Sequence, residues 1–468
     1  MLCAINRLGE KIALKKEDTE PMESPELTRR LFVKTTALAA TALPTFRILA
    51  DTPAEAKIEN QVNVAVIGYG AEGTILTDDL LLIPGVRVKA VCDIWKPRRQ
   101  RAKGILRAKG HKAEVFEDYR EMLSAMKGQI DAVVIATPDW MHHTHTIACL
   151  EAGLDVYCEK EMSNSLEHAK AMVQAMRRTG RILQIGHQRR SNPRYRHAID
   201  TVIRRNRLLG RVTHAYAQWN RSVAPFVQAP PRHIIDGKTL EKYGYANMEQ
   251  FLNWRWFSKY GGGPMVDLGS HQIDLFFWIW DALPTSVCAI GGNDYYKREM
   301  GDCAQALYEF KCSDGFIGRA SYRVLTTSSL GGFYEQFMGD CGSLTLSEVA
   351  ARGNVVLREP NAPAWDVQAR QGLILPVPQT ITRTSTTDAS VDVRVSRELE
   401  GWPLPVELNK PAHLPHLENF FEAVRAKDPK RLTCPADLAY ESAVAVLAVN
   451  RAIATRQPVL FEPSDFRV

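Results

Sequence analysis

The chain has 468 residues, of which 45% are hydrophobic and 24% charged. These values are typical of a soluble globular protein, and the length predicts more than one domain. Lys and Arg number 59 against 53 Asp and Glu, a formal net charge of +6 that is spread along the chain. The one long basic run, "IWKPRRQRAKGILRAKG", reads better as a solvated helix face than as a nucleic-acid site, so we expect no nucleic-acid partner.

The first 59 residues are interpreted as an export signal and linker. The run "TRRLFVKTTALAATALP" places Arg29 and Arg30 before a short, mildly apolar, Ala- and Thr-rich segment, and it resembles a twin-arginine signal near residues 22–50. This segment is shorter than the about 20 apolar residues that span a bilayer. We therefore expect export to the periplasm through the twin-arginine machinery, without a stable membrane span afterwards. An amphipathic first helix of the fold is the alternative.

From residue 60 to residue 185, strand-like and helix-like stretches alternate. Strands are expected at residues 62–68, 86–93, 131–137 and 155–160, with helices at residues 71–83, 96–110 and 143–153. This alternation predicts an α/β, doubly wound parallel sheet of the Rossmann type.

After Gly186 the pattern changes to that of an α+β domain covering residues 186–468. Longer polar and aromatic strands are expected at residues 211–220, 302–324 and 342–347, and an apolar helix at residues 271–281. They predict a large, open, mostly antiparallel sheet. Residues 352–411 are rich in Pro, Thr and charge and are interpreted as an irregular arm or insertion, and the closing helices at residues 416–426 and 437–455 are expected to pack back onto the body.

Three glycines lie between the first strand and the first helix. Gly68, Gly70 and Gly73 form the pattern G-x-G-x-x-G, with Asp93 about 20 residues on at the end of the second strand, the context in which the glycines admit a pyrophosphate to a helix N-terminus. A carboxylate at that place binds ribose hydroxyls and disfavours a 2′-phosphate, so the pattern favours NAD over NADP. The turn residues Tyr69, Ala71 and Glu72 are included in the predicted cofactor site. The alternative is a tight turn without a ligand.

Two further strand ends carry polar residues that are expected at the same edge of the sheet. "IATPDWMHHTHT" places Thr137, Pro138 and His142 there, and "DVYCEKEMSNS" places Glu159 and Lys160. We predict that all five line the cofactor crevice. A metal site formed by the clustered histidines is the less favoured reading, because no carboxylate or cysteine lies at a matching offset, and we expect no metal.

The second domain offers an acid and a histidine one helical turn apart. In "SKYGGGPMVDLGSHQIDL", Asp267 and His271 are four residues apart and follow a run of three glycines. A neutral histidine can accept a proton from a hydroxyl, and a neighbouring carboxylate can orient it. The alternative is an ordinary buried histidine.

These segments together resemble the Gfo/Idh/MocA family of glucose-fructose oxidoreductase and inositol dehydrogenase. The motifs are "AVIGYGAEG", "ATPDWMHHTH", "EAGLDVYCEK" and "GGGPMVDLGSHQIDL", in that order. The resemblance implies that Lys160, Asp267 and His271 are catalytic. It also marks Arg190, Asn192 and Tyr195, in "IGHQRRSNPRY", as neighbours of the substrate or nicotinamide. Glu161 departs from the pattern, because the family has a proline after this lysine.

The resemblance implies an enzyme, an NAD-dependent oxidoreductase acting on a CH–OH group of a sugar, glycoside or cyclitol. Export favours a tightly retained cofactor. A redox-neutral NAD-dependent glycosidase and a catalytically idle sugar-binding relative are the alternatives. Trp254, with Trp219 and Trp256, is a candidate to stack on the sugar ring, and an ordinary place in the apolar core is the alternative. The resemblance also implies a homodimer or homotetramer that pairs through the open sheet.

Overall fold

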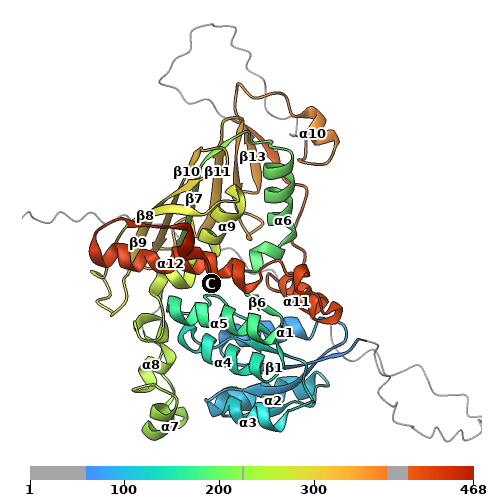
Figure 1. The fold of residues 1–468 in the computed structure, drawn as a ribbon, viewed down its shortest axis with the longest axis vertical. Helices are drawn as coiled ribbons and strands as arrows, with labels where there is room; N and C mark the ends of the chain where they lie inside the picture. The colour runs from blue at the N-terminus through green and yellow to red at the C-terminus, as the bar shows by residue number, and fades with distance from the viewer. Residues whose placement is uncertain (1–59, 224–225, 377–398) are drawn as a thin grey trace, which may run out of the picture. The chain divides into compact units, whose positions relative to one another are not determined.

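The computed structural model describes residues 60–223, 226–376 and 399–468 (Figure 1). The export signal predicted in residues 1–59 therefore lies outside the described residues. The described chain contains two sheets, one parallel and one largely antiparallel, and this confirms the predicted fold class. Within the described ranges, no helix combines the length and apolar character needed to cross a membrane.

The first sheet has six parallel strands in the order β3-β2-β1-β4-β5-β6. The order reverses between β1 and β4, which is where dinucleotides bind in such folds. Strands β1, β4 and β5 are almost completely buried, because helices cover both faces. The strands are β1 (Val62–Ile67), β2 (Val86–Cys92), β3 (Glu114–Phe116), β4 (Ala132–Ile135), β5 (Asp155–Cys158) and β6 (Leu183–Ile185). The helices between them are α1 (Ala71–Leu80), α2 (Lys96–Ala108), α3 (Tyr119–Ala125), α4 (Asp139–Glu151) and α5 (Leu166–Thr179).

The two closing helices, α11 (Leu414–Ala426) and α12 (Ala436–Thr455), return to the first domain. Leu417, Phe420 and Phe421 of α11 are fully buried in the same apolar cluster as Val64 of β1. Helix α12 packs against α5 of the first domain and against α9 of the second. The Rossmann sheet is therefore covered partly by residues from the far end of the chain.

The second sheet has nine strands in the order β14-β13-β12-β11-β7-β10-β9-β8-β15, antiparallel except for the central pair β7 and β10. One face packs on α9 (Ser270–Trp280). The other face is open, and Leu307 and Ile290 are exposed on β9 and β8. The strands are β7 (Val212–Asn220), β8 (Pro284–Gly292), β9 (Cys303–Lys311), β10 (Ile317–Leu325), β11 (Phe333–Gly339), β12 (Gly342–Leu346), β13 (Val355–Arg358), β14 (Glu400–Pro403) and β15 (Val459–Leu460). The helices α6 (Pro193–Arg196) and η2 (His197–Arg205) join the two domains.

The stretch expected to be an irregular arm, residues 352–411, is partly regular. Its described part contains β13, the short helix α10 (Asp366–Arg370) and β14, and β13 pairs with both β12 and β14 at the edge of the sheet. Residues 377–398 lie outside the described residues. The interpretation as irregular structure is therefore wrong for the two strands. The consecutive strands β12 and β13 pair with each other, and β14 pairs with β13 across a long stretch of the sequence, which leaves little local signal.

A long connection leaves β7 and returns at the π-helical turn η5 (Met265–Gly269) before α9. It contains the short helices α7 (Gly237–Lys242) and α8 (Met248–Leu252). In Figure 1 these helices lie beside the first domain, away from the second sheet. Their apolar side chains form a separate small core with Trp95 and Trp140 of the first domain.

Candidate active site

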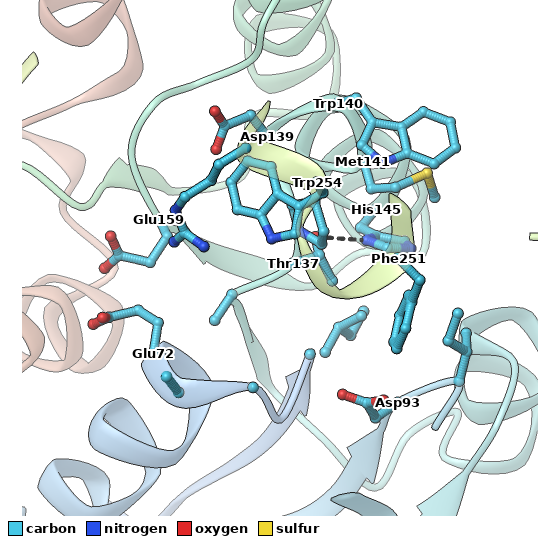
Figure 2. Close-up of a pocket in the computed structure, with 18 of the residues that line it drawn as sticks. Glu72, Asp93, Thr137, Asp139, Trp140, Met141, His145, Glu159, Phe251 and Trp254 are labelled. Carbon is cyan, nitrogen blue, oxygen red and sulfur yellow. Dashed lines mark hydrogen bonds between the residues drawn. The ribbon is translucent and has the colours of Figure 1, made fainter. Parts of the chain in front are cut away.

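A cavity of about 890 Å³ lies between the carboxyl ends of the parallel strands and the second domain. This volume is in the upper part of the range of small-molecule sites. Asp93 and Phe251 lie at one end of the cavity, and Glu72 and Glu159 lie at the other (Figure 2). Of the predicted site residues, the cavity is lined by Gly68, Gly70, Ala71, Glu72, Asp93, Thr137, Pro138, Glu159, Lys160, Trp254, Asp267 and His271.

The glycine turn between β1 and α1 brings the helix N-terminus to the cavity. Gly68 has a φ of +91°, and a Cβ on Gly73 would lie 1.9 Å from the carbonyl oxygen of Gly68, so α1 packs against the turn at a distance that only glycine permits. A Cβ on Gly70 would meet no protein atom closer than the Arg98 guanidinium at 3.7 Å. The open space beside Gly70, at the start of α1, fits the pyrophosphate of a dinucleotide.

The carboxylate of Asp93 lies at the adenosine end of this site. It accepts hydrogen bonds from the backbone amides of Tyr69 and Trp95, both at 2.8 Å, and its Oδ2 lies 3.6 Å from Nη1 of Arg98. Each oxygen retains a second lone pair for a ribose hydroxyl. The residues present therefore fit NAD, and the two amides hold the carboxylate in place. Tyr69 itself is buried and contributes its backbone.

The histidines that follow β4 hold the loop together. His142 is buried, with Nδ1 2.7 Å from the carbonyl oxygen of Glu161 and Nε2 2.7 Å from that of Thr137, so it lies between two cofactor-facing loops without lining the cavity. Burial lowers the pKa of His142 to about 4, so the ring is neutral and donates one hydrogen bond. His145, another of the clustered histidines, lines the cavity and lies 3.1 Å from the Thr137 hydroxyl (Figure 2).

No group of three or more His, Cys, Asp or Glu side chains is arranged to hold a metal ion in the part of the chain that the structure describes.

Glu159 is buried at the end of β5 and held by two donors. It accepts hydrogen bonds from the Tyr157 hydroxyl at 3.0 Å and from the Lys160 amide at 3.1 Å. Burial, followed by the charge of Glu72, raises the pKa of Glu159 to about 7. Glu72 in turn lies 3.3 Å from Nε2 of His413, a cavity residue that sequence reasoning missed because it follows the arm near the end of the chain.

Lys160 meets the second domain at Asp267. Its Nζ donates to the Asp267 carbonyl oxygen at 2.6 Å and lies 3.5 Å from the carboxylate. The same carboxylate receives a hydrogen bond from Nε of Arg255 at 3.0 Å and lies 3.6 Å from Nη2 of Arg221. Burial favours the neutral acid, but Arg255, Lys160 and Arg221 outweigh it and hold the pKa of Asp267 well below its usual range. Asp267 is therefore an anion surrounded by three cations, two of which sequence reasoning did not identify.

His271 presents a neutral base to the same region. Its side chain is 8% exposed, and its Nδ1 has no hydrogen-bond partner among the described residues. Burial and then the charges of Lys160 and Arg189 lower its pKa well below the ordinary value. The Trp219 ring lies beside it, with centroids 5.6 Å apart. The imidazole is thus neutral at neutral pH, which is the form that can accept a proton.

Two buried acids beside Lys160 have pKa values near neutrality, which the sequence did not predict. Asp139, at the start of α4, faces the cavity, and burial raises its pKa to about 7 (Figure 2). Glu161, which replaces the family proline, is fully buried, and burial raises its pKa to about 8. The peptide bond between Lys160 and Glu161 is cis. The Glu161 Oε1 accepts the Met162 amide at 2.7 Å.

Arg190, Asn192 and Tyr195, predicted as neighbours of the substrate or nicotinamide, have other partners in the structure. None of them lines the cavity. Arg190 forms a buried ion pair with Asp274 at 2.7 Å, Asn192 caps α6, and the Tyr195 hydroxyl donates to Glu335 at 2.6 Å. The partners of Arg190 and Tyr195 come from segments far along the chain, so the local sequence gave no sign of these two structural roles.

Of the three tryptophans considered for the sugar site, two line the cavity and one does not. Trp254 and Trp219 line the cavity, and the Arg255 guanidinium lies 4.3 Å from the centre of the Trp254 ring. Trp256 lies outside the cavity lining, against Arg298.

Two family models match the sequence of the chain. The model of an oxidoreductase family with an NAD-binding Rossmann fold (GFO_IDH_MocA) matches residues 62–187, and the model of the GFO/IDH/MocA C-terminal domain matches residues 202–344. The two matches together span more than half of the chain. The chain belongs to the Gfo/Idh/MocA family. Because the chain belongs to this family, it is an NAD-dependent oxidoreductase.

Individual Gfo/Idh/MocA relatives are moderately similar. The scyllo-inositol 2-dehydrogenase (NAD(+)) of Bacillus subtilis is 29% identical over 56% of this chain and 67% of its own length. The D-glucoside 3-dehydrogenase of Escherichia coli is 27% identical over 48% of this chain and 55% of its own length, so that alignment spans little more than half of the relative.

Solved structures of the family share the fold. The scyllo-inositol dehydrogenase from Lactobacillus casei, solved with bound NAD(H) and scyllo-inositol, superposes with a TM-score of 0.58 at 18% identity, over 86% of this chain and 99% of that one.

Proposed function

We propose that this protein oxidises a secondary hydroxyl of a sugar, glycoside or cyclitol to the ketone, and reduces the ketone in the reverse direction. The observation that carries the proposal is the meeting of Lys160, Asp267 and His271 in one cavity with the glycine turn and Asp93. The names of the relatives support this substrate class, because they include an inositol dehydrogenase and a glucoside dehydrogenase.

When bound, NAD supplies the hydride acceptor, and the chain supplies the proton chemistry. In the oxidation, the hydroxyl proton passes to the neutral imidazole of His271 while the carbinol carbon loses its hydride and becomes a carbonyl carbon. The Lys160 ammonium donates a hydrogen bond to the substrate oxygen as charge develops on it. Asp267 holds Lys160 and Arg255 in place.

The experiment is to add a panel of cyclitols, free sugars and glycosides to the purified protein with NAD and to record the absorbance of the reduced nicotinamide. A lasting rise with at least one free hydroxyl substrate supports the proposal. Release of an aglycone without lasting reduced cofactor would instead show the redox-neutral glycosidase reaction. Binding without either change would show an idle sugar-binding relative.

We also infer that the protein is exported to the periplasm through the twin-arginine machinery. The support is the sequence around Arg29 and Arg30, followed by a short Ala- and Thr-rich segment. The test is to fuse residues 1–59 to a reporter and measure its periplasmic fraction. We expect export that is lost when both arginines are changed to lysine. A reporter that stays in the cytoplasm, or export that is insensitive to the change, would contradict this proposal.

We further propose a homodimer or homotetramer that pairs through the open face of the nine-stranded sheet. The exposed apolar residues Leu307 and Ile290 on this face support it. Changing both to aspartate should lower the mass measured by light scattering to that of the monomer. An unchanged mass, or a monomeric wild type, would contradict it.

A further inference from the structure

Two half-exposed arginines line the cavity at the end where Lys160 lies. Arg221 directly follows β7, and Arg255 lies in the 3₁₀ turn η4 (Trp254–Trp256) of the long connection. Their side chains are 49% and 43% exposed, whereas those of Lys160 and Asp267 beside them are each 12% exposed. The two guanidinium groups are therefore the most open cations of this cluster.

One carboxylate serves all three cations of the cluster. Nε of Arg255 donates to Oδ1 of Asp267 at 3.0 Å, Nη2 of Arg221 lies 3.6 Å from Oδ2, and Nζ of Lys160 lies 3.5 Å from Oδ1. Because a single negative charge cannot balance three positive charges, the cluster itself carries a net positive charge.

Three other acids line the cavity around this cluster, and none of them supplies a full negative charge to it. Burial raises the pKa values of Asp139 and Glu159 to about 7, so both carboxyl groups are only partly ionised at neutral pH. Glu348 accepts a hydrogen bond from Nε of the buried Arg189 at 3.1 Å. Arg189 also pairs with Glu335, whose pKa is raised by burial. An anionic group on a bound molecule would therefore improve the balance of charge at Arg221 and Arg255.

The two guanidinium groups keep most of their hydrogen-bond donors for a ligand. Each guanidinium carries five N–H groups. Among the residues that the structure describes, Arg255 donates a hydrogen bond only through Nε, and the contact of Arg221 with Asp267 is longer than a hydrogen bond. Carboxylates and phosphates are the groups that such a planar fork binds with two parallel hydrogen bonds.

Packing limits the motion of both arginines. The Arg221 amide donates to the Leu325 carbonyl oxygen at 2.9 Å, which fixes the backbone at the end of β7. The Arg255 guanidinium lies 4.3 Å from the centre of the Trp254 ring, and a Cβ on Gly261 would lie 3.1 Å from Cα of Arg255. Because less conformational freedom is lost on binding, groups held in this way bind a ligand more tightly.

We propose that the substrate is an acidic sugar or cyclitol, whose carboxylate or phosphate binds Arg221 and Arg255 while Lys160 and His271 act on its hydroxyl group. This inference rests on the proposed function and adds the charge of the substrate to it. The anionic group takes no part in the bond changes, so it orients the substrate and is released intact. An uncharged sugar of the same size lacks a partner for both guanidinium groups and should therefore be a poorer substrate.

The test compares substrates that differ mainly in charge. One set is methyl glucuronide, its methyl ester and methyl glucoside, another is glucose 6-phosphate and glucose, and the corresponding galactose compounds are included. We measure kcat/KM with NAD and, separately, binding by the quenching of tryptophan fluorescence, because Trp219 and Trp254 line the cavity. We expect at least one anionic compound to exceed its neutral counterparts by about 10-fold or more in both kcat/KM and affinity.

Variants of the arginine assign this preference to the cluster. Arg221→Gln should lower the ratio of kcat/KM for the anionic compound to that for its neutral counterpart by about 10-fold or more. The ratio cancels any general loss of activity. Arg221→Lys keeps the positive charge and should retain part of the preference. The control is Arg178→Gln, which removes an arginine from an exposed ion pair with Glu151 outside the cavity lining and should keep the wild-type ratio.

The outcomes separate this inference from the proposed function. Neutral compounds that bind and react as well as their anionic counterparts, or a ratio that Arg221→Gln leaves unchanged, would overturn the acidic substrate and leave the dehydrogenase activity intact. An equal loss of NADH affinity in Arg221→Gln would also overturn it, because the arginine would then bind the cofactor. If no compound reduces NAD, the proposed function fails, and the fluorescence titrations still decide whether an anion is preferred. Melting temperatures identify any variant that has unfolded, and Arg255→Gln serves if Arg221→Gln does not fold.

Discussion

The charge of each acid in the site is decided by its neighbours as well as by its burial. Asp267, Asp139 and Glu161 are all buried acids, yet the pKa of Asp267 is lowered while the other two are raised to about 7 and about 8. The difference arises because Arg255, Lys160 and Arg221 all lie at the Asp267 carboxylate. The presence of Asp267 and His271 was evident from the sequence. The arginines that surround Asp267 were not, because they come from separate segments.

The first prediction concerns the protonation state of His271. Since burial and the nearby cations lower its pKa well below 6.5, the ring should remain neutral as the pH falls through about 6.5, where a solvent-exposed histidine is half protonated. The measurement is the ring-proton NMR signal of His271, assigned by its absence from His271→Asn. A titration midpoint at or above the ordinary value would contradict the prediction.

The same variant tests the catalytic role of the imidazole. His271→Asn removes the proton acceptor, so turnover should fall by about 10²- to 10⁴-fold, the usual contribution of general base catalysis. NADH binding should be unchanged, because His271 lies away from Asp93 and the glycine turn. Full turnover in a folded His271→Asn variant would show that another residue is the base.

The protonation of Glu161 makes the stability of the folded protein depend on pH. Its pKa is raised from 4.5 to about 8, so the folded state binds a proton that the unfolded state loses. The stabilisation is complete below about pH 4.5 and is lost as the pH rises through about 8. Glu161→Gln keeps the oxygen that accepts the Met162 amide and removes this dependence. At pH values above about 8 the variant should be more stable, by on the order of a few kcal/mol.

Calorimetric melting curves between about pH 5 and about pH 9 provide the measurement. Glu121→Gln, at an exposed position of α3, is the matched control. Parallel pH dependence of the melting temperature in the wild type and Glu161→Gln would mean that Glu161 does not carry the extra proton.

In the turn between β1 and α1, one glycine serves the packing of the helix and another serves the binding of the cofactor. Gly73 contacts the Gly68 carbonyl, whereas Gly70 faces open cavity. Gly73→Ala should lower the melting temperature, because α1 has to move away from β1. Gly70→Ala should melt like the wild type but bind NADH at least 10-fold more weakly, because its methyl group occupies the place of the pyrophosphate. Melting curves and NADH titrations check both, and equal affinity in Gly70→Ala would place the pyrophosphate elsewhere.

The parallel sheet was predictable because its signals are local. Each buried strand is a continuous apolar run, and each helix follows within a few residues. Strand β14 and the connection between β7 and η5 were not predictable in this way. Strand β14 pairs with β13 across a long stretch of the sequence, and the connection accepts a hydrogen bond from Trp95, which lies far away in sequence.

In the whole molecule, the active site is formed by residues from both domains and from segments that lie far apart in the sequence. The first domain supplies the glycine turn, Asp93 and Lys160, the second supplies Asp267 and His271, and His413 arrives from beyond the arm. The sequence motifs predicted the first two contributions because each motif is short and continuous. Arg190, Asn192 and Tyr195, predicted as neighbours of the substrate or nicotinamide, lie outside the cavity lining, because adjacency to a motif does not determine on which side of the cavity wall a side chain lies.

The most direct test of direct hydride transfer uses substrates deuterated at carbon. The purified protein is incubated with NAD and C-deuterated cyclitols or sugars that were active in the panel, and the reduced cofactor is analysed by mass spectrometry. If the protein is the dehydrogenase described here, the reduced cofactor carries one deuterium from the substrate carbon, and His271→Asn forms almost none. Reduced cofactor without deuterium, or no reduced cofactor with any hydroxyl substrate, would contradict this account.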